Sequence, residues 1–154
     1  MPVEAPISKY RKTNLKIYIT ACLFIGIWCI YDGYFNKTWI EEHRNEDGSP
    51  QAYLVFNRTA PLFFFGGAVL LGSYLFAIRN KRLIADGNEL IVSDKEKIAY
   101  DSIQKIDKTH FDPTRGYFVV TYKQEDGREI NRKISSKDYD NLAAVLDALV
   151  AKIT

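Results

Sequence analysis

The sequence predicts an α+β membrane protein: a two-helix transmembrane hairpin, then a small antiparallel β-barrel or sandwich capped by a C-terminal α-helix. Two uncharged apolar runs lie in the first half of the 154 residues. Short segments rich in β-branched and aromatic residues, separated by turn signals, fill most of the second half. The chain closes on a segment whose apolar residues recur at helical spacing.

Composition excludes some functional classes. The formal charge of +2, from 21 Lys+Arg and 19 Asp+Glu, lacks the basic excess of a dedicated nucleic-acid-binding protein. Both cysteines, Cys22 and Cys29, fall in the first apolar run and predict neither a disulfide framework nor a CxxC metal site. We expect no cofactor.

The second apolar run predicts the clearer transmembrane helix, over residues 59–78. It contains twenty residues without a charge and is followed by Arg79, Lys81 and Arg82. At about 1.5 Å per residue, such a helix spans the roughly 30 Å hydrocarbon core of a bilayer.

The first run, Ile17–Tyr31, has fifteen uncharged residues, which is short of a full span. Lys16 can snorkel at one end, and residues 33–35 extend the apolar length beyond Asp32, so we expect a helix over 15–35. A second apolar run and the lack of a small-residue cleavage site favour a retained anchor over a cleaved signal. Residues 1–14 are expected to form a flexible or surface-lying N-terminal cytoplasmic arm.

Small residues predict where the two helices pack. Along the first helix they form one stripe, which allows close approach of a neighbouring helix: Cys22, Gly26, Cys29 and Gly33. The matching face on the second helix is Ala68 with Gly72, or Gly66 with Ser73 and Ala77. Packing within the hairpin is favoured over a docking face for another subunit.

Asp32 is the one ionisable residue near membrane depth in the first helix. A carboxylate there can mark a proton or ion path, but no second ionisable residue continues a relay. We therefore expect an interfacial, solvated aspartate.

Residues 36–58 form the expected extracytoplasmic loop. Asp47–Pro50 is a turn signal, and Trp39, Tyr53 and Phe56 are expected to be interfacial anchors around a short hairpin or amphipathic cap. Cations flank the other ends of both helices: Lys9, Arg11, Lys12, Lys16, Arg79, Lys81 and Arg82. The positive-inside rule therefore places both termini in the cytoplasm.

Residues 79–154 are predicted to be a cytoplasmic domain of about six short antiparallel strands. Gly87-Asn88 joins 82–86 to 89–93 as a hairpin, and further strands are expected at 97–100, 102–111, 116–123 and 128–134. We expect residues 80–154 to fold without the anchor.

A closing helix is predicted after the strands. Ser135 or Ser136 is the expected N-cap, followed by acids in the first turn. One apolar stripe at helical period faces the sheet: Tyr139, Leu142, Ala143, Leu146, Leu149, Val150 and Ile153.

This order of strands and closing helix after two membrane helices resembles bacterial membrane proteins with pleckstrin-homology-like (PH-like) domains. The resemblance covers residues 80–154 through RLIADGNELIVS, KIAYDSIQKIDKTHF and GYFVVTYK, plus the anchor. It implies a binding or scaffolding domain. The first hairpin turn is acidic, at Asp86 and Glu89, which argues against inositol-phosphate recognition.

The sequence therefore predicts a non-catalytic integral protein of the cytoplasmic (inner) membrane, an accessory or scaffolding subunit of a larger complex. Its expected partners are other integral membrane subunits and membrane lipids. One alternative is a lipid-headgroup sensor that uses Arg79, Lys81 and Arg82, because juxtamembrane cations attract anionic headgroups. Another is a subunit of a small transporter.

Overall fold

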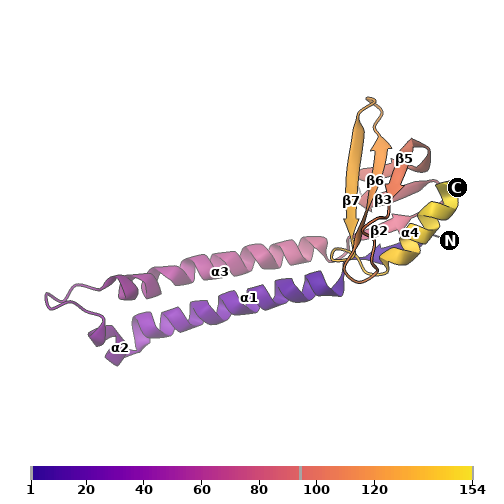
Figure 1. Ribbon diagram of the computed structural model, residues 1–154. Helices are drawn as coiled ribbons and strands as arrows, with labels where there is room; N and C mark the ends of the chain where they lie inside the picture. The colour runs from indigo at the N-terminus through magenta and orange to yellow at the C-terminus, as the bar shows by residue number, and fades with distance from the viewer. Residues whose placement is uncertain (1, 94, 154) are drawn as a thin grey trace. The chain divides into compact units, whose positions relative to one another are not determined.

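The computed structural model describes residues 2–93 and 95–153. The chain divides into two compact units (Figure 1). One is the helical unit, residues 13–76. The other, the β unit, combines the residues up to Lys12 with those from Ala77 onward.

The helical unit contains two long helices side by side (Figure 1). Helix α1, Lys9–Ile30, continues into one π-helical turn, η1, Tyr31–Phe35, and α3 covers Ala52–Ile78. Each continuous helix has 27 residues and is long and apolar enough to cross a membrane. Both helices begin earlier than the predicted ranges 15–35 and 59–78. The apolar runs mark only the part of each helix suited to lipid, and each helix also includes the polar residues before its run.

The connection between the helices is correspondingly shorter than the predicted 36–58. It begins with a short helix, α2, Lys37–Glu42, whose N-cap Asn36 accepts a hydrogen bond from the Trp39 backbone N–H. The chain then reverses in a tight turn closed by a bridge between Arg44 and Pro50. The turn predicted at Asp47–Pro50 lies here.

The β unit holds seven strands among the described residues, in two antiparallel sheets. The first sheet has the order β1-β2-β3-β4 and comprises Val3–Pro6, Arg82–Ala85, Glu89–Ser93 and Glu96–Ala99. A 3-10 turn, η2, Tyr100–Ser102, leads to the second sheet. That sheet has the order β5-β6-β7 and comprises Ile103–Asp107, Tyr117–Lys123 and Glu129–Ser135. The predicted hairpin around Gly87-Asn88 is present as β2 and β3.

The N-terminal segment is an edge strand, and the expectation of a flexible or surface-lying arm is wrong for residues 3–6. Strand β1 pairs with β2 over four residues, from Val3↔Ala85 to Pro6↔Arg82. Ala5 is fully buried in the core of the β unit. The chain thus supplies the first strand before the helical hairpin and the other six after it.

The core of the β unit lies between the sheets and α4, Leu142–Ile153. Phe118, Val120 and Ile134 come from the second sheet, Leu83 and Leu90 from the first, and all are buried. Helix α4 adds the buried side chains Leu142, Val145, Leu146 and Leu149.

Helix α4 begins at Leu142, so the predicted N-cap at Ser135 or Ser136 is wrong. Residues 138–140 instead pair with the N-terminal segment: Tyr139 forms a bridge with Ile7, and the Asp140 N–H donates to the Pro6 carbonyl at 2.9 Å. These long-range backbone bonds replace the local capping that the sequence favours. Of the predicted stripe, Tyr139 lies outside the helix and Ile153 is exposed. Val145, which the predicted stripe does not include, is buried.

Candidate functional site

Small residues of α1 face α3 inside the hairpin. A Cβ added at Gly26 would lie 3.1 Å from the Phe65 ring, and one at Gly33 would lie 3.0 Å from the Asn57 carbonyl oxygen. Cys29 on α1 and Ala68 on α3 are buried as well. The close approach of the two helices therefore needs small side chains at these positions.

One member of the predicted small-residue interface has no close neighbour, and another is half-buried. A Cβ added at Gly72 would meet nothing within 4 Å, so that position has no close neighbour. Cys22 is half-buried. The same open surroundings occur at Gly66, the alternative position on α3.

Large side chains of the hairpin face outward. Phe24 is 74% exposed and Trp28 69% on α1, and Phe63 is 75% exposed on α3. Other large apolar side chains on the outer surface are Ile27, Tyr31, Phe56, Leu62, Val69, Leu70 and Phe76. The hairpin thus presents an aromatic outer surface of the kind that packs against protein or lipid.

A polar cluster lies at the π-helical turn. Asp32 is buried within the chain, which corrects the expectation of a solvated aspartate, and its Oδ1 accepts a hydrogen bond from Asn36 Nδ2 at 3.0 Å. Arg58 on α3 donates from Nε to the Gly33 carbonyl at 3.0 Å and stacks over the Tyr34 ring at 5.6 Å. The π turn shifts the register of α1 here and gathers these groups at one level of the hairpin.

The cations of the β unit that lie next to the apolar helices in the sequence are partly neutralised by acids. Arg82 pairs with Glu4 at 2.7 Å across β1 and β2. Arg11 pairs with Asp138, and the Lys9 backbone N–H donates to an Asp140 carboxylate oxygen at 3.0 Å. Lys81 is exposed at the start of β2. The predicted headgroup site at Arg79, Lys81 and Arg82 is therefore less basic than three adjacent cations suggest.

A shallow groove of about 280 Å³ opens beside Lys81 and Arg82. It runs along the first sheet and is lined by Ala77, Asn80, Lys81, Arg82, Ile84, Ile91, Val92 and Ser93. Its lining combines apolar side chains with the two cations Lys81 and Arg82.

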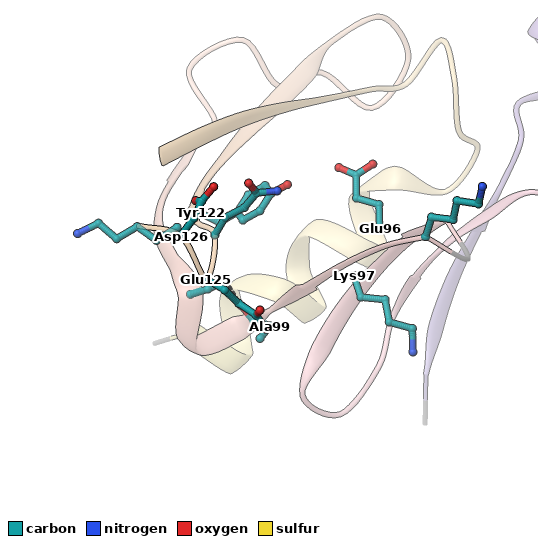
Figure 2. A pocket seen from close by; sticks show the side chains of 10 residues that line it. Glu96, Lys97, Ala99, Tyr122, Glu125 and Asp126 are labelled. Atoms are coloured by element: carbon teal, nitrogen blue, oxygen red, sulfur yellow. Dashed lines mark hydrogen bonds between the residues drawn. The ribbon is translucent and has the colours of Figure 1, made fainter. Parts of the chain in front are cut away.

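A larger open groove, of about 510 Å³, lies between β4 and the end of β6 with the turn that follows (Figure 2). Figure 2 shows that Glu96 and Lys97, adjacent on β4, point in opposite directions. Three acids and three lysines line the groove: Glu96, Glu125, Asp126, Lys95, Lys97 and Lys123. Glu96 also forms an ion pair with Arg132 at 3.0 Å. This mixed charge gives the groove no preference for an anion or a cation.

Two side chains of this groove, Tyr122 and Asp126, have a shifted pKa. Burial, followed by the nearby charge of Glu96, raises the pKa of the Tyr122 phenol and keeps it protonated. Hydrogen bonds from the Arg128 side chain and backbone lower the pKa of Asp126 and keep it ionised. Neither shift activates a nucleophile or a base near neutral pH.

The residues that could suggest metal or base chemistry do not converge. Within residues 2–93 and 95–153 no group of three or more His, Cys, Asp or Glu side chains is arranged to hold a metal ion. His43 stacks on Trp39 at 3.9 Å, and His110 lies against Tyr117 at 5.3 Å. Both histidines make ring contacts in turns.

The described residues therefore offer two kinds of surface: the outer face of the hairpin, with its polar cluster, and open grooves on the β unit. Sequence reasoning indicated a close helix contact at Gly26 and Gly33, but it missed the burial of Asp32 at a π turn, which has no sequence signature. No family model, curated protein or solved structure matches this chain.

Proposed function

We propose that this chain is a non-catalytic integral membrane protein that serves as an accessory or scaffolding subunit of a larger membrane complex. Its helical hairpin docks on other membrane-spanning subunits, and its β unit covers partner surface on the cytoplasmic side.

The observation that carries this proposal is the arrangement of side chains in the hairpin. Small residues of the first helix allow close contact with α3, where Gly26 faces the Phe65 ring, whereas Phe24, Trp28 and Phe63 are left exposed on the outside. Phe24, in the middle of the run Ile17–Tyr31, and Trp28, four residues later, lie on the same face of α1. Exposed aromatic side chains are the usual anchors of protein interfaces.

The topology of the β unit supports a hairpin with both ends on one side of the membrane. Strand β1 precedes the two apolar helices and β2 follows them, yet the two strands pair. A chain that crosses a membrane between them must cross it an even number of times. The cations at these ends favour the cytoplasmic side.

The order of strands supports a PH-like β unit. Six or seven short antiparallel strands followed by a C-terminal helix is the arrangement that the resemblance implies, and β1 adds a seventh strand to the six of the segment 80–154. A domain of this kind binds partners through its surface, and its fold does not select the ligand.

The test is extraction of the tagged full chain in a mild detergent, with the yield of stoichiometric membrane partners as the readout. Two double alanine variants are compared, Phe24→Ala with Trp28→Ala and Phe63→Ala with Phe76→Ala. Each should reduce that yield about tenfold or more, because losing an aromatic anchor costs over 1–2 kcal/mol. Gly26→Leu is unsuitable here, because it would collide with Phe65 inside the hairpin. Unchanged yield in both aromatic pairs would contradict the proposal.

The groove beside Lys81 and Arg82 favours a second candidate, a sensor of anionic lipid headgroups. Its apolar lining residues and its two cations suit a lipid at the membrane surface. This function requires that replacing Arg79, Lys81 and Arg82 by glutamine abolishes salt-dependent binding to anionic vesicles. The docking function requires that the same variant keeps its partners.

A further inference from the structure

We propose that the face of α1 around Asp32 binds a membrane-spanning helix of a partner subunit that carries a lysine or arginine at the level of Asp32. This inference rests on the proposed docking function and names the chemistry of the partner.

The face has the shape that receives a helix. Phe24, Trp28, Asp32 and Asn36 follow one another at intervals of four residues, and Ile27 with Tyr31 forms the adjacent row. A groove of about 430 Å³ lies among these six side chains. Rows at i and i+4 bound the grooves into which the side-chain ridges of a second helix pack.

Asp32 gives this otherwise apolar groove a charge. Its side chain is nine-tenths buried, at 8% exposure, and it lines the groove. Within the described parts of the chain, Asn36 is its one hydrogen-bond partner, through Oδ1. A buried carboxylate accepts several hydrogen bonds, so a ligand in the groove can supply a donor to Oδ2.

The hairpin does not supply a cation itself. Arg58 lies at the same level, but its Nε is bound to the Gly33 carbonyl and its guanidinium stacks on Tyr34. No ion pair joins Asp32 to a cation within residues 2–93 and 95–153. Since a carboxylate near lipid is costly unless it is paired, charge complementarity favours a cation from outside the chain as the ligand.

The exposed aromatic rings fit the same occupant. Trp28 and Tyr31 lie beside Asp32 in the groove, and an ammonium or guanidinium group can contact their faces while it pairs with the carboxylate. A helix also places its apolar residues against Phe24 and Ile27, which a headgroup alone would leave in contact with lipid chains.

The experiment uses the full-length protein in phosphatidylcholine–phosphatidylglycerol vesicles, with Trp39→Phe so that Trp28 is the remaining tryptophan. The probes are synthetic leucine–alanine transmembrane peptides with a dansyl acceptor and one lysine, leucine or glutamate at the level of Asp32. Energy transfer from Trp28 reports binding in the groove. We expect the lysine peptide to bind roughly three- to twentyfold more tightly than the leucine peptide, the range of polar contacts between membrane helices, and the glutamate peptide to bind worst.

Asp32→Asn keeps an acceptor for the Asn36 amide and removes the charge. It should abolish the preference for lysine, so that the lysine and leucine peptides bind the variant equally, and Asp32→Glu should restore the preference. Equal binding of the lysine and leucine peptides to the Asp32 protein would overturn the proposal, whatever the variants do, as would a preference that survives Asp32→Asn.

Two further results would replace the partner helix by another occupant. Loss of the lysine preference when phosphatidylethanolamine is added would identify a lipid ammonium group as the ligand. Self-association of the protein that Asp32→Asn removes, without a lysine preference, would identify a second copy. If the Phe63 and Phe76 variant lost its partners while the lysine and leucine peptides bound the protein equally, this inference alone would be refuted. The docking function would remain.

Discussion

Gly116 joins the loop after β5 to the start of β6, and no other residue fits there. A Cβ at this position would lie 1.9 Å from the Asp112 backbone nitrogen and 2.6 Å from the His110 carbonyl oxygen. The Gly116 carbonyl also accepts hydrogen bonds from the Ser136 N–H at 3.0 Å and the Ser136 hydroxyl at 2.9 Å. The backbone of the loop and the segment before α4 therefore meet at this glycine.

We expect Gly116→Ala to destabilise the β unit by more than about 2 kcal/mol, because the clash is with backbone atoms that cannot turn away. Urea denaturation followed by amide hydrogen exchange in β6 would measure the loss. Gly87→Ala is the matched control, since a Cβ there meets nothing within 4 Å. Equal protection in the two variants would refute this account of the loop.

Aspartates in the turns make the stability of the β unit depend on pH. Hydrogen bonds from the Thr109 and Thr114 side chains, and then from backbone N–H groups, lower the pKa of Asp107 and Asp112 below the ordinary value of 3.8. Because the folded-state pKa is below the unfolded one, the stabilisation is present above about pH 4 and is lost as the pH falls through the folded-state values.

The urea midpoint of the β unit should therefore decrease between pH 5 and pH 3. Asp112→Asn keeps an oxygen for the Thr114 N–H but cannot titrate, so it should reduce this decrease. Asp147→Asn, which removes a carboxylate from the exposed face of α4, should not. A midpoint that is constant down to pH 3 would contradict the role of these turns.

At the level of the elements, the β unit depends on β1, a strand that precedes the helical hairpin while the rest of the unit follows it. Ala5 has no exposed surface, and the segment after β1 fixes residues 138–140 through the Ile7–Tyr139 bridge and a hydrogen bond from the Ser8 N–H to the Asp138 carbonyl at 2.9 Å. A fragment that begins at Ala77 lacks these contacts and exposes the edge of β2.

We therefore expect residues 77–154 alone to unfold without cooperativity, and the same fragment joined to residues 2–8 by a flexible linker of about ten residues to unfold cooperatively. Ala5→Asp in the linked fragment should abolish folding, because it buries an unpaired charge. Glu4→Gln, on the exposed side of the strand, should be tolerated. Cooperative unfolding of 77–154 alone would restore the simpler expectation from sequence.

The elements that the sequence predicts are those with local signals. Each of these signals is contained in one continuous segment: the Gly87-Asn88 turn, the alternating β-branched residues of β6, and the two uncharged runs. Strand β1 is short, ends in Pro6 and has its partner beyond the hairpin, so no local pattern distinguishes it from an arm. The predicted start of α4 is wrong because it too depends on a distant segment: the N-terminal segment holds residues 138–140 outside the helix.

The candidate site was predictable to a similar extent. The spacing of Gly26 and Gly33 indicates a close helix contact, and each does face α3. Asp32 is buried at the π turn Tyr31–Phe35, and a π turn has no sequence signature.

For the whole molecule, the pairing of β1 with β2 joins the two ends of the apolar hairpin in one β unit. Such a chain can span a membrane only if both ends stay on one side, and the tight turn between α2 and α3 then lies on the other. This topology is what the docking function and the groove around Asp32 both require.

The most direct test labels single cysteines in intact cells with a membrane-impermeant thiol reagent, in a chain with Cys22 and Cys29 replaced by alanine. Ser49→Cys, in the turn between α2 and α3, should react. Pro2→Cys, next to β1, and Ser93→Cys, at the end of β3, should react only after the cells are opened. Different accessibility of the cysteines at positions 2 and 93 would contradict the account, because β1 and β2 could then not pair across the membrane.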